Sequence, residues 1–271
     1  MLKQRVLTAL WLLPLALAGF FYLHGAAFAL FIGLVVCLGG WEWARLAGLQ
    51  GQPARLAYST LVAAWLLGLY QLPSLAPWVL WLALAWWLWA TVLVLGYPRS
   101  QRLWAGRPGK CLMGLLILLP AWQGLVLLKQ WPQGNALILA VMLLVWGADI
   151  GAYFAGKTFG KRKLAPRVSP GKSWEGAIGG LCTSLLLTLG FALYQGWPWA
   201  ASLQAMLGAA LIVAFSIIGD LNESMFKRQA GIKDSSNLLP GHGGVLDRID
   251  SLTAAVPLFA LLLWLAGWAA P

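Results

Sequence analysis

The 271-residue sequence has few acidic side chains, few histidines, few cysteines and little charge overall. It contains 8 acidic residues, 2 histidines and 3 cysteines, and only 10% of its residues are charged. With 61% hydrophobic residues and a mean hydropathy of +0.76, this composition excludes a soluble globular protein. The cysteines form no CxxC pair, so neither structural zinc nor a disulfide framework is supported. The chain is therefore expected to lie in a membrane.

Nine apolar runs, each long enough to cross a bilayer as a helix of about 20 residues, dominate the sequence. They predict the fold class, an all-α integral membrane protein built as a polytopic bundle of about nine transmembrane helices. The third run is the weakest of the nine. The first run contains a small-residue stretch typical of a signal-peptide cleavage site but continues to Leu23, so we expect this helix to be retained. The runs cover residues 6–23, 26–44, 56–72, 78–97, 111–128, 136–155, 176–194, 201–218 and 252–269.

The basic residues fall almost entirely on one side of this predicted bundle. With nine spans, 18 of the 19 Lys and Arg residues lie on the same side as the N-terminus, and Lys129 alone lies on the other. Loops rich in Lys and Arg face the cytoplasm, so the N-terminus and the charged loops are expected there. The net charge of +11 then reflects membrane topology, and no nucleic-acid partner is expected.

The segment 220–250 holds five of the eight acidic residues of the chain. Within it, the triplet Asp220, Glu223 and Ser224 has the spacing i, i+3, i+4, and Asp247, Asp250 and Ser251 repeat that spacing. If both stretches are helical, each places its oxygens on one face. Two such faces brought together form an all-oxygen cluster of the kind that holds Mg²⁺.

The same segment carries groups suited to phosphate. Four cations accompany the acidic residues, namely Lys227, Arg228, Lys233 and Arg248. Between them, residues 239–244 read LPGHGG, and three glycines allow backbone N–H groups to approach an anion closely. These features indicate a metal-assisted phosphate site. A solvated charged loop between two spans is the alternative, but it does not account for acidic residues at helical spacing beside a glycine-rich turn.

A second informative segment covers residues 146–176. Asp149 lies late in an apolar span and Tyr153 one turn further on, so both share a face; an ionisable residue at that depth is a functional candidate. Pairing of Asp149 with an arginine of a neighbouring helix is the structural alternative. A basic loop with Lys157, Ser169 and Lys172 follows, and Ser173 is a candidate N-cap for the next helix, whose N–H groups would then face an anion.

Two patterns in this part of the chain are not specific to a nucleotide site. Residues 151–158, GAYFAGKT, match the Walker spacing, but they finish a membrane span rather than link a strand to a helix, so the match is attributed to chance. The basic loop could also bind acidic lipid headgroups. Elsewhere, Glu42 and Arg45 at i, i+3 predict an interfacial ion pair of small energetic worth, and Arg107 and Lys110 are weaker functional candidates.

The 220–250 segment resembles the signature of the phosphatidate cytidylyltransferases, also called CDP-diacylglycerol synthases. The basic loop after Asp149 resembles the corresponding region of the same family. The matching positions are Ser224, Lys227, Arg228, Lys233, Asp234, Leu239, Pro240, His242, Gly243, Gly244, Asp247, Arg248 and Asp250. The resemblance implies that CTP and phosphatidic acid react to give CDP-diacylglycerol and pyrophosphate in phospholipid biosynthesis. It further implies a bacterial plasma (inner) membrane location with a cytoplasmic active site, and a homodimer, although no interface is identifiable in the residues.

Roles are assigned on the residues and the resemblance together. Asp220 and Asp247 are the principal Mg²⁺ ligands, with Asp250 and Glu223 as further metal ligands; a second cation is left open. The catalytic set is Asp220, Asp247, Lys227, Arg228, His242 and Arg248. The substrate-binding set is Ser224, Lys233, Asp234, Gly243, Gly244, Asp149, Tyr153, Lys157, Ser169 and Lys172.

The chain is expected to form one integral membrane domain over residues 1–271. Residues 1–130 would be mainly scaffold and lipid-facing helices, and residues 135–251 the catalytic part. Two other functions remain as alternatives at this point. One is another CTP-dependent lipid enzyme, of the polyprenol kinase or CDP-archaeol synthase type. The other is a cation-coupled transporter, whose membrane carboxylates would bind the coupling ion, but which predicts neither the dense one-sided basic set nor the glycine-rich turn.

Overall fold

The computed structural model describes residues 2–268, and over that range nine α-helices follow one another with short connections. Two 3₁₀ segments, η1 (Pro73–Leu75) and η2 (Arg99–Leu103), and one small hairpin lie between them. The helices are α1 (Leu2–Phe21), α2 (Gly25–Leu46), α3 (Gln52–Gln71), α4 (Ala76–Leu95), α5 (Arg107–Gln130), α6 (Gly134–Phe159), α7 (Trp174–Tyr194), α8 (Trp199–Gln229) and α9 (Leu246–Leu265).

Each predicted span coincides with one of these helices, which confirms the all-α polytopic membrane fold. Within the described residues, seven helices are long and apolar enough to cross a membrane. The two helices outside this set are α1, for which the described residues give a shorter apolar stretch, Leu10–Phe21, and α3, which carries polar residues such as Gln52 and Arg55. The end of the last predicted span, at residue 269, lies outside the described residues.

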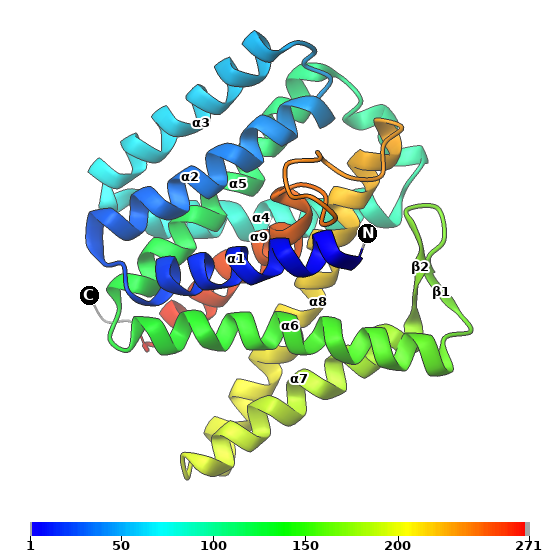
Figure 1. Ribbon diagram of the computed structural model, residues 1–271. Helices are drawn as coiled ribbons and strands as arrows, with labels where there is room; N and C mark the ends of the chain where they lie inside the picture. The colour runs from blue at the N-terminus through cyan, green and yellow to red at the C-terminus, as the bar shows by residue number, and fades with distance from the viewer. Residues whose placement is uncertain (1, 269–271) are drawn as a thin grey trace.

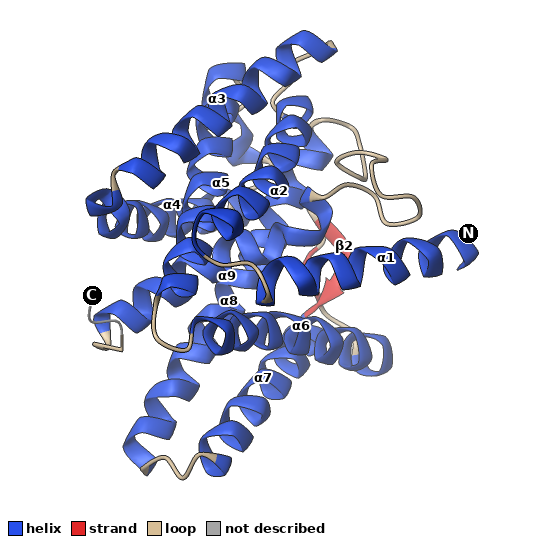
Figure 2. Cartoon of the chain, turned by 60° about the vertical axis from the view of Figure 1, so that its left-hand side comes forward, coloured by secondary structure: helices blue, strands red, loops and turns tan. Residues whose placement is uncertain are grey.

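Helix α9 is the centre of the packing. It contacts α2, α4, α5, α6 and α8, and Ala254, Ala255 and Val256 on it are almost completely buried. Figure 1 shows α2, α3 and α5 on one side of α9 and α6, α7 and α8 on the other. Helix α7 and the first half of α8 project from the rest of the bundle in both views (Figures 1 and 2). The N-terminal turns of α9 are therefore where the two groups of helices meet.

The charged connections gather at one end of the bundle. The α6–α7 connection, the α8–α9 connection and the N-terminal end of α1 all lie on the right-hand side of Figure 1, and the C-terminal end of α9 lies at the opposite end. This arrangement agrees with the one-sided distribution of Lys and Arg in the sequence. It brings the two informative segments, 146–176 and 220–250, to the same end of the molecule.

Helices α6 and α7 pack closely because small residues line their contact. A Cβ atom on Gly180 would lie 2.5 Å from the carbonyl oxygen of Ala148, and one on Gly151 would lie 2.8 Å from the carbonyl oxygen of Gly179. Only glycine allows two helix backbones to approach this closely, as in the small-residue interfaces of membrane helices. The close contact sets the position of the C-terminal turns of α6 relative to the start of α7.

The basic loop between α6 and α7 contains a hairpin that the sequence did not predict. Strands β1 (Lys163–Ala165) and β2 (Ser169–Ser173) pair antiparallel. The carboxylate of Glu175 accepts hydrogen bonds from the backbone N–H groups of Lys161 and Arg162, at 3.1 and 3.2 Å, and so closes the base of the hairpin. The loop is therefore an ordered element that presents β2 toward α8.

Candidate functional site

The acidic triplets of α8 and α9 lie on helices, as their spacing predicted, and they meet around Lys227. Its Nζ donates to Glu223 Oε2 at 3.0 Å and to Asp247 Oδ1 at 2.7 Å. The three side chains are only 10%, 4% and 5% exposed. A buried lysine between two carboxylates is compensated twice, so this contact holds α8 and α9 together at the level of the charged cluster.

The second oxygen of Asp247 organises the connection between the two helices. Oδ2 accepts hydrogen bonds from the Ser235 N–H and the Ser235 hydroxyl, both at 2.9 Å, and from the Gly244 N–H at 2.8 Å. Both oxygens of Asp247 thus have protein partners. Ser235 was not identified from the sequence, and its role depends on a contact twelve residues along the chain.

Asp220 links this cluster to the hairpin. Its Oδ2 pairs with Lys172 Nζ at 2.6 Å, and its Oδ1 accepts a hydrogen bond from the Ser224 hydroxyl at 3.2 Å. The side chains of Lys172 and Asp220 are each 27% exposed, so the pair is accessible from outside. The two segments singled out in the sequence are therefore parts of one site.

The remaining predicted metal ligands lie beside Asp220. Asp250 interacts with Asp220 and with Glu223, and Glu223 Oε1 is buried without a protein donor among residues 2–268. Closely spaced carboxylates with an unsatisfied oxygen suit a hard cation, so the donor chemistry fits Mg²⁺. In the described part of the chain, however, no group of three or more His, Cys, Asp or Glu side chains is arranged to hold a metal. The predicted metal site stays a prediction.

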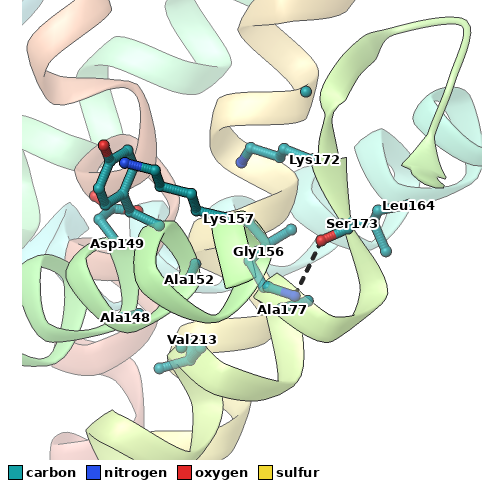
Figure 3. A pocket seen from close by; sticks show the side chains of 15 residues that line it. Ala148, Asp149, Ala152, Gly156, Lys157, Leu164, Lys172, Ser173, Ala177 and Val213 are labelled. Atoms are coloured by element: carbon teal, nitrogen blue, oxygen red, sulfur yellow. Dashed lines mark hydrogen bonds between the residues drawn. The ribbon is translucent and has the colours of Figure 1, made fainter. Parts of the chain in front are cut away.

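A cavity of about 370 Å³ lies beside this cluster, between α6, α7, α8 and β2. Asp149, Tyr153 and Lys157 line it from α6, which confirms that Asp149 and Tyr153 share a face, and Lys172 lines it from β2 (Figure 3). The first turn of α7 forms the floor with Gly176. The cavity thus combines two lysines with a helix N-terminus, a combination that favours an anionic ligand.

The hairpin and the helix start that border the cavity are held by local contacts. The Ser173 hydroxyl accepts a hydrogen bond from the Gly176 N–H at 3.1 Å, drawn as a dashed line in Figure 3, and so caps α7 as expected. Arg228 Nε donates to the Val168 carbonyl at 3.1 Å, which ties the end of α8 to the hairpin turn. Ser169 starts β2 but does not line the cavity. Residues 151–158 lie inside α6, so they form no P-loop.

The glycine-rich turn packs on the opposite side of Asp247. Gly243 has φ +84°, and a Cβ atom there would lie 2.8 Å from Asp247 Oδ2, so no other residue fits. The turn is closed by a hydrogen bond from the Leu239 N–H to the Gly243 carbonyl at 2.8 Å, and Thr8 of α1 donates to the Pro240 carbonyl at 2.9 Å. His242 Nδ1 is buried and has no partner among residues 2–268.

The other predicted site residues lie at the surface of this region. Lys233 and Asp234 are exposed on the α8–α9 connection, and Arg248 is exposed on the first turn of α9. Their side chains are accessible to a soluble ligand, but they are not part of the buried cluster.

Glu42 is the main residue whose role the sequence pattern did not reveal. It was predicted to form a surface ion pair with Arg45, but its side chain is completely buried, and the ion pairs found in residues 2–268 do not include it. Its carboxylate accepts hydrogen bonds from the Ser236 hydroxyl at 2.5 Å and from the Val245 and Leu246 N–H groups at 2.9 and 2.6 Å. The Ser235 hydroxyl lies 3.2 Å away, but its one proton goes to Asp247 at the shorter distance. The predicted ion pair is therefore wrong.

Glu42 instead caps α9 from another helix. Val245, the residue at the N-cap position, has no capping side chain of its own, so the α2 carboxylate satisfies N–H groups that would otherwise lack an acceptor. Gly244 leaves room for it, because a Cβ atom there would contact Glu42 Oε1 at 2.5 Å. A signal for Glu42 did exist: it is an ionisable residue within a predicted span, the same reason that identified Asp149.

Comparisons with known proteins agree with this geometry. The cytidylyltransferase family profile matches residues 3–266. The chain is 71% identical to the phosphatidate cytidylyltransferase of Pseudomonas aeruginosa over 271 residues, which cover 100% of both chains. It is 43% identical to that of Haemophilus influenzae over 281 aligned positions, covering 96% of this chain and 98% of the relative. A Staphylococcus aureus phosphatidate cytidylyltransferase is 46% identical over 132 residues, 48% of this chain and 50% of the relative. The chain therefore belongs to the cytidylyltransferase family.

Proposed function

We propose that this protein transfers CMP from CTP to phosphatidic acid, giving CDP-diacylglycerol and pyrophosphate. The observation that carries the proposal is the 2.6 Å contact between Lys172, which lines the cavity, and Asp220 of the carboxylate cluster. It makes an anion-binding cavity and a cation-binding cluster one continuous site, as a nucleotidyl transfer requires. The names of the relatives from Pseudomonas aeruginosa and Haemophilus influenzae support the same reaction.

The triphosphate of CTP would occupy the cavity. Lys157 and Lys172 supply positive charge there, and the N-terminus of α7 adds backbone N–H groups. Tyr153, which is 60% exposed, offers an aromatic face at the rim. Arg228, Lys233 and Arg248 would hold phosphates from the α8–α9 side, and the glycine-rich turn with His242 would border the nucleotide.

Mg²⁺ would bind to the carboxylates that line the other side of the site. Asp220, Glu223, Asp247 and Asp250 supply the oxygen ligands, and the unsatisfied Glu223 Oε1 supports a cation at this place. When bound, the ion would neutralise charge on the triphosphate. A second cation stays a prediction. Lys227, already shared between Glu223 and Asp247, would hold these two carboxylates in place.

The chemistry needs positioning more than proton transfer. A phosphate oxygen of phosphatidic acid attacks the α-phosphorus of CTP; the new P–O bond forms as the bond between the α-phosphorus and the bridging oxygen breaks, and pyrophosphate leaves with that oxygen. Because the attacking phosphate monoester is already ionised near neutral pH, a general base is not required. Repulsion between anions and charge on the leaving group dominate the barrier, and the lysines of the site would lower both, with Mg²⁺ supplying further positive charge when it is bound.

The surroundings of the site suit a lipid substrate. The outer face of α6 beside the cavity carries exposed apolar side chains, among them Ile150 at 58% and Phe154 at 63%. The acyl chains would remain in the bilayer while the headgroup enters the site from the plasma-membrane surface, with CTP arriving from the cytoplasm. The one-sided basic loops support this orientation. A homodimer is proposed on the family resemblance alone.

The test is pyrophosphate release by the purified chain in detergent with CTP, Mg²⁺ and phosphatidic acid. We expect release only when all three are present. ATP in place of CTP, and diacylglycerol in place of phosphatidic acid, are the controls. Formation of CDP in place of pyrophosphate, with CTP and diacylglycerol, would point to a lipid kinase instead. No release with any nucleotide, from protein that unfolds cooperatively, would contradict the proposal and favour ion-binding assays for a transporter.

Asp247→Asn tests the carboxylate cluster within that assay. The substitution removes the charge that faces Lys227 and weakens the acceptor for Ser235 and Gly244. We expect turnover to fall by about 10²- to 10³-fold, the size of effect seen when one preorganised electrostatic contact is removed. Full Mg²⁺-dependent activity in Asp247→Asn would exclude Asp247 from the metal and phosphate chemistry.

A further inference from the structure

A second cavity, of about 560 Å³, lies apart from the α6–α7 cavity, where the ends of α2, α3, α5 and α8 meet. Arg45 and Arg55 line it together with Lys110, and the α8 end contributes Gln229. Arg107 stands beside it, because a Cβ atom on Gly48 would lie 3.8 Å from both the Arg107 side chain and Lys110 Nζ. Four cations therefore lie in or beside this cavity, and none of its lining residues is acidic.

Among residues 2–268, no ion pair within hydrogen-bonding distance neutralises these cations. The three ion pairs present in residues 2–268 involve Lys172 and Lys227 only. Lys110 is 5% exposed, yet its ammonium donates only to the neutral Gln229 side chain, at 3.1 Å. Glu42, one turn before Arg45, is fully buried and already accepts three hydrogen bonds from the 235–246 segment. Burying a lysine without a carboxylate is costly, so an anion bound beside Lys110 would be stabilising.

Arg55 points to the same conclusion. Its guanidinium stacks on the Trp41 ring at 3.4 Å, and its Nε donates to the Trp41 carbonyl at 3.1 Å. Its Nη2 is buried and has no hydrogen-bond partner in the described part of the chain. A planar guanidinium held in this way is preorganised for phosphate oxygens.

The helix ends do not offset this charge. The cavity receives the first turns of α3 and α5, whose N-termini attract anions, and the last turns of α2 and α8, whose C-termini repel them. The partial charges of two helix N-termini and two helix C-termini nearly cancel, so the charged side chains determine the sign of the electrostatic potential in the cavity. The field in the cavity is therefore positive.

We propose that this cavity is a second anion site, distinct from the CTP and phosphatidic acid site, which binds the phosphate of an anionic lipid headgroup. Basic pockets between membrane helices on the cytoplasmic side bind such headgroups. The outward face of α3, which starts at the cavity, carries exposed apolar side chains along its length, among them Leu56 at 57% and Trp65 at 52%. A headgroup in the cavity would leave its acyl chains beside this face, whereas a free phosphate would gain nothing from it.

The second anion site borders the α8–α9 connection. Arg45 Nη1 donates to the Ser235 carbonyl at 3.3 Å, and the Ser235 hydroxyl donates to Asp247 Oδ2. A bound headgroup would therefore steady Arg45, and through it the connection that carries Ser235. The binding itself does not depend on the reaction proposed above.

The test measures binding to the purified full chain in detergent by native mass spectrometry. The probes are dihexanoyl phosphatidylglycerol, dihexanoyl phosphatidylcholine and inorganic phosphate. We expect one phosphatidylglycerol to bind in preference to phosphatidylcholine, with an affinity that falls as salt rises. Arg55→Gln and Arg107→Gln should each weaken it by about tenfold, the loss expected for one charge-assisted hydrogen bond. Arg102→Gln, an exposed arginine outside the cavity lining, is the matched control and should leave the affinity unchanged.

Binding of inorganic phosphate with the same sensitivity to Arg55→Gln and Arg107→Gln would keep the anion site but identify its ligand as a soluble phosphate. Equal affinity of all three arginine variants for phosphatidylglycerol, with unchanged melting temperatures, would overturn the proposal. Because Arg107 is exposed, its variant remains informative even if Arg55→Gln fails to fold.

Discussion

The α8–α9 cluster and the α6–α7 cavity contain the same kinds of side chain but satisfy them in opposite ways. In the cluster, Lys227 is buried between two carboxylates, and Asp247 has protein partners on both oxygens. In the cavity, Lys172 has one partly exposed partner, Asp220, and Lys157 is exposed. In the cluster, the charged groups are satisfied within the protein and serve as a structural framework. The cavity leaves charge available for a ligand, and Asp220 belongs to both.

The cluster should therefore contribute mainly to the stability of the fold, and the cavity mainly to ligand binding. Removing a partner from a saturated buried network leaves charges without compensation, which destabilises the fold. Removing a partly exposed cation costs little stability because water replaces its partner. Substitutions in the two regions should therefore affect unfolding and turnover in different proportions.

Lys227→Met should have the largest effect. It leaves Glu223 and Asp247 facing one another in a buried place, and removing one partner of such a pair costs ~3–5 kcal/mol. We expect a strongly lowered melting temperature in detergent and almost no turnover. An unchanged melting temperature would show that these carboxylates are compensated by something other than Lys227.

Glu42→Ala should come next, with a loss of ~2–4 kcal/mol, because several buried donors lose their acceptor and α9 loses its cap. The measurement is again the melting temperature. Glu175→Gln is the control, since that carboxylate accepts from exposed N–H groups at the base of the hairpin and should shift the melting temperature far less. Equal shifts for both variants would mean that Glu42 does not support α9.

Gly180→Ala should destabilise by ~1–3 kcal/mol, because the added methyl group meets the Ala148 carbonyl oxygen and forces α6 and α7 apart. Gly190→Ala, on the same helix but with open space around its Cβ position, is the matched control and should be neutral or slightly stabilising. If the two variants have the same melting temperature, the close packing of α6 on α7 does not limit stability.

Lys172→Met should have the smallest effect on folding, ~1 kcal/mol or less, because its ion pair is partly exposed. Its effect should appear in kinetics instead, as about a tenfold or greater rise in the KM for CTP, since a charge-assisted contact to phosphate is lost. Lys172→Arg should restore most of the affinity. A variant with unchanged KM and a lowered melting temperature would place Lys172 in the framework rather than in the nucleotide site.

Much of this molecule could be predicted from hydropathy and spacing. Apolar runs predicted the helices, and the i, i+3, i+4 triplets predicted which oxygens share one face of α8 and one face of α9. Asp149 and Tyr153 lie on one side of α6, and Ser173 caps α7, as expected. Each of these features depends on residues within a few positions of one another, where helix geometry alone decides the outcome. The metal ligands and the division of the chain at residues 130–135 remain predictions.

The features that the sequence did not reveal join residues far apart. The hairpin is closed by Glu175 reaching back to Lys161 and Arg162, and the contact of Lys172 with Asp220 joins the hairpin to α8. Arg45 and Lys110 likewise became lining residues of a cavity only through the meeting of four helix ends.

By itself, the sequence determined the membrane fold and the gathering of the charged loops at one end of the bundle, because hydropathy, charge and helical period act locally along the chain. Only the tertiary structure decided which partner each charge has. Glu42 could have paired with Arg45 three residues away, but it caps α9 about 200 residues along the chain. Three buried donors stabilise its carboxylate more than one exposed arginine would, and only the folded bundle brings them together.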